Sequence, residues 1–235
     1  NNLIQVFKNP KNSSKYSHIC ETRSLDENVF GIPKVSSIKI TNKPDIYNNH
    51  IRIMLPHMKT EIPIFILFRA LGCESDKEIV YHIIDNNGSK IDKTMLKVLK
   101  LSIEEAFDIK TETEAIKFIS KNINNNSYYI QNEEKKISYV KEVILKEYLN
   151  HIGDDVQKKI CFTGNKINKL IKCYVGIIPF DDRDSYLNKR FETPGYLLGS
   201  LTYQCVHKIT KDIKNYLNKE VNSGLWNINK QFNDI

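Results

Sequence analysis

The sequence lacks the cysteine pattern of metal-stabilised and disulfide-stabilised domains. Its five cysteines are Cys20, Cys73, Cys161, Cys173 and Cys205, and none is spaced as Cys-x-x-Cys. A disulfide framework or a structural zinc site requires clustered cysteines. We therefore expect buried free thiols in a reducing compartment.

A long hydrophobic run is also missing. The longest one, Ile62–Phe68, ends at Arg69, whereas a transmembrane helix needs about 20 apolar residues. We therefore expect no membrane partner. The first residue is Asn1, and no charged and apolar leader precedes a small-residue cleavage site. These features suggest a piece of a longer protein that is not secreted.

The motifs of several enzyme classes are missing as well. There is no Gly-rich phosphate loop and no nucleophile elbow. The carboxylates of Asp181, Asp182 and Asp184 suggest a metal-dependent nuclease, because hard cations bind clustered carboxylates. However, Arg183 stands among them and no Glu or His completes a two-metal site. The sequence therefore predicts no catalytic residue and no metal ligand.

Structural roles are expected for His57, His82 and Arg69. His57 and His82 have no ligand-spaced companions, so we expect ordinary hydrogen-bonding histidines. Arg69 follows the apolar run, and we expect it to pair with Glu61 or with a carboxylate of a neighbouring element.

An excess of basic charge is present. The formal net charge is +7 over 235 residues, with a pI of about 9.0. Lys and Arg release counterions from nucleic-acid phosphates, so this charge is compatible with a polyanionic partner. It is equally compatible with solubility alone. The hydrophobic fraction of 40% and the charged fraction of 27% are ordinary for a globular protein.

The N-terminal part has the alternating, β-branched pattern of strands. Such runs cover Leu3–Phe7, Tyr16–Arg23, Val35–Ile40 and Ile51–Leu55. The connections are too short for crossover helices, so the pattern predicts a small antiparallel sheet.

Helical signals follow the strands. Apolar spacing, Pro63 and Gly72 predict a short buried helix over 61–71. Capping boxes begin at Ser75 and Thr111, and Asp92 is a further candidate cap. Longer helices are expected at residues 133–152, 156–175 and 195–222. The fold class is therefore α+β: a small antiparallel sheet from the N-terminal strands and several packed helices, ending in a long helix of a second module.

Ordered blocks of the sequence resemble the second-largest subunit of eukaryotic and viral multisubunit DNA-directed RNA polymerases. The matching stretches are Leu55–Ile64, Leu67–Gly72, Asp76–Ile79 and Asp181–Arg190, with Gly195, Leu197 and Leu198 after the last. Their order and spacing hold over nearly the whole chain. One departure is Leu187, which stands where the family usually has Gly.

The resemblance implies a domain organisation. Residues 1–184 correspond to the lobe domain, and residues 185–235 correspond to the start of the returning half of the protrusion domain. In the family these modules help to form one wall of the DNA cleft. The family's catalytic Mg²⁺ is held by the largest subunit and its Zn²⁺ by a C-terminal region, neither of which is present here. The resemblance therefore implies no cofactor in this segment.

The best candidate site is the loop Asp181–Arg190. Arg183, Lys189 and Arg190 either contact nucleic acid or brace the junction between the two domains, and both roles are compatible with their charges. Lys208, Lys211 and Lys214 recur at every third residue of the last helix. They form either a basic stripe along a nucleic-acid backbone or the solvated face of an amphipathic helix.

These observations predict a non-catalytic fragment of a polymerase subunit, inactive by itself and active in nucleotidyl transfer only within the complex. Its expected partners are the largest subunit, other polymerase subunits, DNA, the DNA–RNA hybrid and transcription factors. The alternative is a free-standing viral adaptor with a lobe-like fold and no catalysis. The expected location is the nucleus, or the host cytoplasm and virion for a viral protein.

Overall fold

The computed structural model describes residues 4–9, 15–25, 33–43, 49–84, 90–123, 133–189 and 191–223. The described part of the chain forms two units. The first contains the sheet and most helices and continues through the loop that ends at residue 189, and the second begins at Phe191. Each unit is described by itself.

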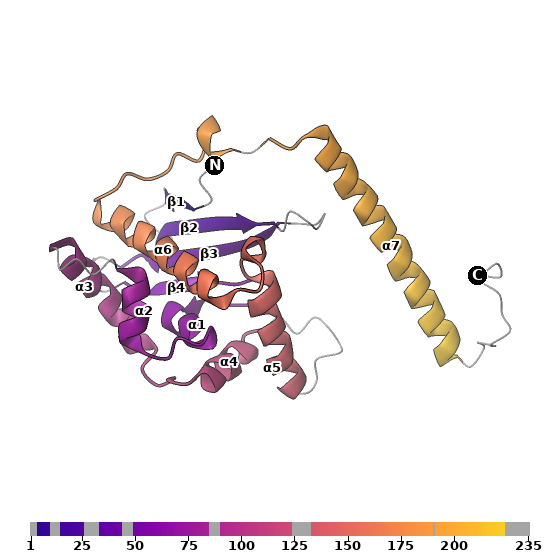
Figure 1. Ribbon diagram of the computed structural model, residues 1–235, viewed down its shortest axis with the longest axis horizontal. Coiled ribbons are helices and arrows are strands. Elements are labelled where there is room, and N and C mark those ends of the chain that lie inside the picture. The colour runs from indigo at the N-terminus through magenta and orange to yellow at the C-terminus, as the bar shows by residue number, and fades with distance from the viewer. Residues whose placement is uncertain are drawn as a thin grey trace. The chain divides into compact units, whose positions relative to one another are not determined.

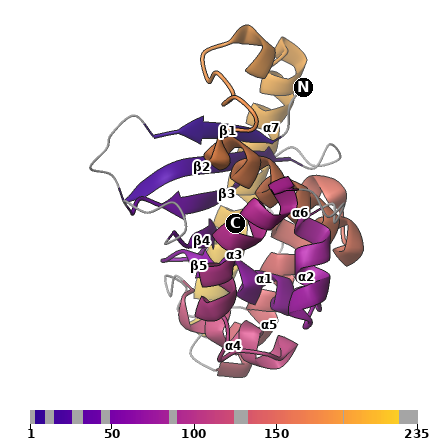
Figure 2. The same ribbon diagram turned by 90° about the vertical axis from the view of Figure 1, so that its left-hand side faces the viewer.

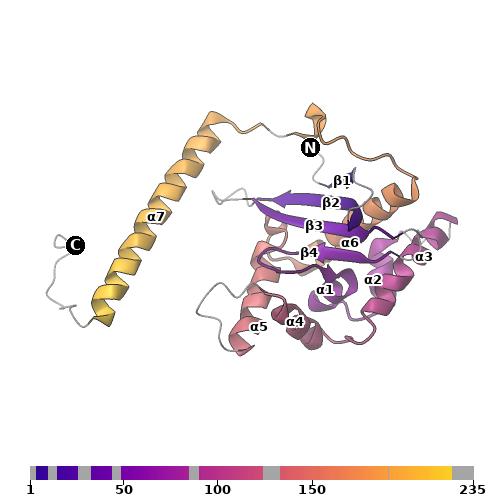
Figure 3. The ribbon, with the colours of Figure 1, turned by 180° about the vertical axis from the view of Figure 1, so that it is seen from behind.

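Five antiparallel strands form one sheet. Four of them lie in the runs that the N-terminal pattern predicts, and the fifth lies in the segment predicted to be helical. The strands follow the chain in space, in the order β1-β2-β3-β4-β5. Figure 3 shows the first four of them side by side. Their bounds are β1 Gln5–Lys8, β2 Tyr16–Ser24, β3 Lys34–Thr41, β4 Ile51–Met54 and β5 Ile62–Pro63. Each strand pairs with its predecessor, which is the arrangement expected from short connections.

Alternation of side chains gives the sheet a buried face and an accessible face. Ile38 and Ile40 of β3 and Ile51 and Ile53 of β4 are fully buried. Lys39, between the two isoleucines of β3, is only half-buried and pairs with Glu61 across 3.2 Å. This period of two explains why β2, β3 and β4 can be recognised from sequence alone.

Helices cover the buried face of the sheet. Figure 2 shows the strands on one side of the first unit and the helices on the other. The helices of this unit are α1 Ile64–Ala70, α2 Asp76–Ile83, α3 Lys90–Glu105, α4 Glu112–Lys121, α5 Glu133–Glu142 and α6 Val156–Val175. Every residue of α1 is buried, which explains the apolar run at this point of the sequence.

Helix α6 has the predicted bounds and packs on both β2 and α2. Its buried residues include Ile160, Ile167 and Leu170. Gly164 lies where α6 crosses α2, and a Cβ atom built on it would stand 2.1 Å from the carbonyl oxygen of His82. Only glycine permits this close approach.

The start of α1 differs from the prediction. Ile62 and Pro63 pair with β4 as strand β5, and the helix begins only at Ile64. The residue before a proline is disfavoured in the α-helical region, so Ile62 stays extended. Gly72 does end this segment, with a positive φ of 94°.

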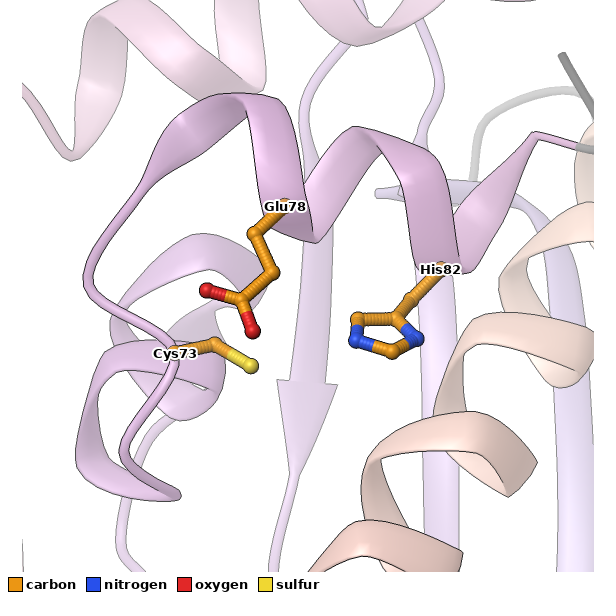
Figure 4. A group of neighbouring side chains, drawn as sticks. All are labelled: Cys73, Glu78 and His82. Carbon is orange, nitrogen blue, oxygen red and sulfur yellow. The ribbon is translucent and has the colours of Figure 1, made fainter.

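Two predicted caps are absent and one is present. Ser75 precedes α2 but makes no side-chain capping bond, and Asp92 lies inside the first turn of α3. Thr111 forms the complete capping box with Glu114 at the start of α4. The capping box predicted at Ser75 is therefore wrong, and the Glu78 side chain, which would complete it, is turned toward Cys73 (Figure 4).

The prediction of a single helix over residues 133–152 is also wrong. Helix α5 continues into a π-helical turn, η2 Val143–Glu147, and Leu149 then adopts a left-handed φ of 52° before the 3₁₀ turn η3 Asn150–Ile152. The Nζ of Lys159, a buried side chain on α6, donates to the carbonyls of Ile144 and Leu145. A long-range bond from another helix thus satisfies carbonyls at the disrupted turn.

Arg69 pairs with a neighbouring element and not with Glu61. Its guanidinium donates to the carbonyls of Ala106 and Ile109 and to the carboxylate of Asp76, the last at 2.5 Å. Every one of these partners lies C-terminal to α1, so this buried cation joins α1, the end of α3 and α2.

The second unit contains the long helix α7 Pro194–Asn222, capped by Thr193. Taken by itself, α7 has no buried residue. Its apolar seam, at positions three or four residues apart, is exposed, with Leu198 at 66%, Leu201 at 58% and Ile209 at 59%. No helix in the described part of the chain is both long enough and apolar enough to span a bilayer.

Candidate functional site

The loop that follows α6 runs beside the first strand of the sheet. The chain leaves α6 at Gly176 and continues through residues 177–189, including the 3₁₀ turn η4 Tyr186–Asn188 (Figure 1). Among the described strands, β1 pairs with β2 alone, so it is the edge of the sheet on this side. The loop therefore covers an edge that would otherwise expose unpaired backbone groups.

Asp181 is the main attachment of this loop. Its N–H donates to the carbonyl of Val6 at 3.0 Å, and its carboxylate accepts from the N–H of Val6 at 2.8 Å. The same carboxylate accepts from Nζ of Lys169 on α6 at 2.7 Å. Lys169 also donates to the carbonyl of Ile4 at 2.8 Å. This half-buried pair ties β1, α6 and the loop together.

Further hydrogen bonds shape the rest of the loop. Gln5 on β1 donates to the carbonyl of Asn188 at 2.8 Å. The Asn188 side chain donates to the carbonyl of Asp182 at 2.7 Å, and the carboxylate of Asp182 accepts from the N–H of Asp184 at 2.9 Å. The loop is consequently held by its own polar groups and by β1.

The predicted basic residues of the loop have separate surroundings. The guanidinium carbon of Arg183 lies 5.4 Å from the ring centroid of Phe7, a cation–π distance. Lys189 is exposed and lies 4.0 Å from the carboxylate of Asp184, also exposed. Arg190 lies outside the described residues. The structure therefore brings Arg183 to β1 and leaves Lys189 in solvent.

The three aspartates of the loop do not converge on one point. Asp181 is engaged with Val6 and Lys169, whereas the carboxylate of Asp182 caps the backbone of Asp184. Among the described residues, the side chains close enough to share a metal ion do not include these three. The geometry gives no support to a two-metal nuclease.

The three predicted lysines of the last helix all lie on α7. Lys208, Lys211 and Lys214 are exposed. Their spacing of three residues turns successive side chains by about 60° around the helix, so they spread over more than one face. Nucleic-acid contact and a solvated helix face both stay predictions for these three lysines.

One cluster of potential ligands was not predicted from the sequence. The thiol of Cys73, the carboxylate of Glu78 and the imidazole of His82 each offer a ligand atom, and these atoms lie within 4.8 Å of one another (Figure 4). Glu78 and His82 are four residues apart on α2, which was the available signal. His57, in contrast, is paired with Glu147 at 2.7 Å, as an ordinary histidine.

Burial changes the protonation of several groups in this unit. Burial, and then the neighbouring carboxylate of Glu78, raises the pKa of the Cys73 thiol to about 11. Burial lowers the pKa of Lys166 on α6 to about 8, and its Nζ donates to the hydroxyl of Ser36 at 3.0 Å. Cys73 is thus a neutral thiol at neutral pH, and Lys166 is a buried charge that bonds to a hydroxyl and to no carboxylate of the described residues.

The sheet, its helical cover and the loop that bonds back to β1 define an α+β domain with a charged loop at one sheet edge. The family model "RNA polymerase Rpb2, domain 2" matches residues 1–192. The chain therefore belongs to the family of second-largest subunits of multisubunit RNA polymerases.

Curated relatives agree with this family. The chain is 36% identical to "DNA-directed RNA polymerase II subunit 2" of Arabidopsis thaliana, over 98% of this chain and 19% of the relative. It is 33% identical to "DNA-directed RNA polymerase II subunit RPB2" of Schizosaccharomyces pombe, over 99% of this chain and 18% of the relative. An archaeal relative, "DNA-directed RNA polymerase subunit Rpo2N" of Methanococcus vannielii, is 29% identical over 86% of this chain and 41% of its own length.

The chain spans about a fifth of the length of its eukaryotic relatives. The resemblance seen in the sequence is confirmed, and so is the α+β fold. These relatives are eukaryotic and archaeal and lend no support to a viral source.

Proposed function

We propose that this chain is a structural segment of the second-largest subunit of a DNA-directed RNA polymerase and acts in transcription. The observation that carries the proposal is the family match over residues 1–192, together with identities of 33–36% over nearly the whole chain to RNA polymerase II subunits. Its partners are then the largest subunit and the other polymerase subunits. For a eukaryotic enzyme of this type the location is the nucleus.

The finer part of the proposal is that the segment forms one wall of the DNA cleft. The loop Asp181–Arg190 contains three acidic and three basic residues, so its formal charge is zero. Asp181 is neutralised by Lys169 and turned toward β1. This arrangement leaves Lys189 exposed at the end of a well-anchored loop, where it can contact a phosphate of DNA or of the DNA–RNA hybrid.

The segment also offers apolar surface for transcription factors. Tyr186 and Leu187 of the same loop are 79% and 85% exposed. Neighbouring exposed apolar side chains on an anchored loop favour protein contact. Bond formation is left to other parts of the enzyme, and this segment supplies position and charge.

The test is charge reversal of Lys189 and Arg190, both to Glu, in the full-length subunit assembled into polymerase. Each lost phosphate contact should lower the slope of log affinity against log salt by about 0.7–0.9. We therefore expect less stable elongation complexes and a salt slope smaller by about 1.5. The measurement is the dissociation of stalled elongation complexes over a series of salt concentrations.

The matched control replaces two exposed lysines of α3, Lys93 and Lys97, with Glu, which changes the net charge by the same amount. It should leave the salt slope unchanged. If Lys189→Glu with Arg190→Glu also leaves the slope unchanged, the loop braces the protein and does not contact nucleic acid.

A further inference from the structure

The turn between α1 and α2 brings three different metal-binding groups to one place. Gly72, with its positive φ of 94°, reverses the chain after α1 and places Cys73 just before α2. Glu78 and His82 project from the same face of α2, because they are one turn apart. Figure 4 shows the Cys73 sulfur beside the Glu78 carboxylate, with one ring nitrogen of His82 turned toward both.

We propose that Cys73, Glu78 and His82 form a zinc-binding site that joins this turn to α2. The sequence predicts no metal ligand in the chain, so the proposal rests on the folded geometry. The three ligand atoms already lie within 4.8 Å of one another.

The donor set selects the metal. A thiolate, an imidazole and a carboxylate together are typical zinc ligands, whereas Mg²⁺ and Ca²⁺ prefer oxygen ligands alone. Tetrahedral zinc with bonds of about 2.0–2.3 Å needs ligand atoms about 3.5 Å apart. Glu78 is exposed and His82 is half-buried, so both side chains can move inward by about 1 Å while the buried Cys73 stays in place.

A fourth residue holds the imidazole from the other side. The Sγ of Cys161 on α6 lies 4.0 Å from Nδ1 of His82. The other ring nitrogen of a zinc-bound histidine usually has a polar partner that orients the ring. We assign this positioning role to Cys161 and leave the fourth coordination position to water. The site then links the turn, α2 and α6 near the close contact of Gly164 with His82.

Metal binding has a chemical cost at this site. The Cys73 thiol is protonated in the metal-free chain and lies against the Glu78 carboxylate. Zn²⁺ displaces this proton to solvent and takes both groups as ligands, with no oxidation or reduction.

The experiment uses the 235-residue chain after removal of metals with a chelator. Zn²⁺ and Co²⁺ are titrated separately, with Co²⁺ reporting thiolate binding by its sulfur-to-metal charge-transfer absorption. We expect one Zn²⁺ per chain and a melting temperature that rises with Zn²⁺ concentration, because the metal binds only the folded state. A chain that binds no Zn²⁺ overturns the proposal.

Two variants and one control test the ligands. Glu78→Gln, at an exposed position, should weaken Zn²⁺ binding by about tenfold or more without unfolding the chain. Cys73→Ser should abolish the charge-transfer absorption, and Cys205→Ser on α7 is the matched control that should retain it. Zn²⁺ affinity unchanged in Glu78→Gln, or cobalt absorption retained in Cys73→Ser, contradicts the assignment.

Cys161→Ser distinguishes positioning from direct ligation. In the proposed site this variant keeps the full charge-transfer intensity per bound Co²⁺ and loses about tenfold in affinity. A fall of this intensity by half would make Cys161 a second thiolate ligand and would overturn the three-residue site.

Discussion

Lys166 is a charged side chain in the middle of the protein core. It is fully buried, its Nζ donates to Ser36, and burial lowers its pKa to about 8. The unfolded chain, with an ordinary lysine pKa, therefore binds more protons between pH 8 and pH 10.5. By linkage, the destabilising contribution of Lys166 is complete below pH 8 and diminishes as pH rises through this window.

We expect Lys166→Met to raise the free energy of unfolding by about 1–3 kcal/mol at pH 7, since it removes the desolvation of a buried charge. The difference in the free energy of unfolding between this variant and the wild type should shrink as pH rises from 8 toward 10. Chemical denaturation at several pH values measures both effects. Lys158→Met, at an exposed position of the same helix, is the control and should change stability by no more than about 0.5 kcal/mol. A variant less stable than the wild type at pH 7 would show that the Ser36 bond outweighs desolvation.

At the scale of elements, the contact of α2 with α6 depends on one glycine. A Cβ at position 164 would meet the backbone oxygen of His82 at 2.1 Å, and a backbone atom can move away only with its helix. The helix-forming advantage of alanine over glycine, about 1 kcal/mol, is smaller than the cost of separating two packed helices.

Gly164→Ala should therefore lower the free energy of unfolding by about 1–3 kcal/mol. Thermal and urea denaturation of the chain measure this loss. Gly195→Ala is the matched control, because a Cβ there meets nothing within 4 Å and the position lies in the first turn of α7. Equal stability of the Gly164→Ala variant and the wild type would show that α2 and α6 can move apart at little cost.

The π-helical turn after α5 is a second feature of element scale. Its carbonyls at Ile144 and Leu145 accept from Lys159, which lies on α6. Amphipathic spacing alone predicts one continuous helix here, because residues 133–152 keep an apolar stripe. The structure instead interrupts the helix where Lys159 of the next helix supplies a donor to the carbonyls of Ile144 and Leu145.

At the scale of the molecule, the described sheet and its helical cover form one unit, and the long helix α7 starts another. The exposed seam of α7 and the coverage of only about a fifth of the eukaryotic relatives agree with a segment of a larger subunit.

We predict that the isolated 235-residue chain incorporates no nucleotide on a primed template. We expect the catalytic Mg²⁺ to be held by another subunit, and this segment is proposed to supply position only. The measurement is incorporation of labelled nucleotide, with assembled polymerase as the positive control. Incorporation above the level without protein would show that the chain has catalytic groups of its own.

Much of the fold follows from local patterns. Strands β2, β3 and β4 alternate in polarity, and the bounds of α6 follow from its apolar stripe and from Gly176 at its end. The capping box at Thr111 needs only residues three positions apart. These features are determined by neighbours in the sequence, so the sequence alone is sufficient to predict them.

The family could also be inferred from the order of short motifs in the sequence. The contacts of the loop Asp181–Arg190 could not be inferred in this way. The charges of Asp181 and Arg183 are visible in the sequence, but their partners Val6, Lys169 and Phe7 lie on other elements. Whether a carboxylate binds a metal, an N–H or a lysine depends on which groups the fold brings within about 3 Å.

The sequence by itself thus determined the class of fold, the antiparallel pairing of its strands and the family of this protein. Only the tertiary structure decided that Lys166 is buried, that α5 breaks at a π-turn, and that Cys73 meets Glu78 and His82. The physical reason is range: hydrophobic periodicity and caps act within a few residues, whereas burial, desolvation and ligand geometry depend on elements that meet only after folding.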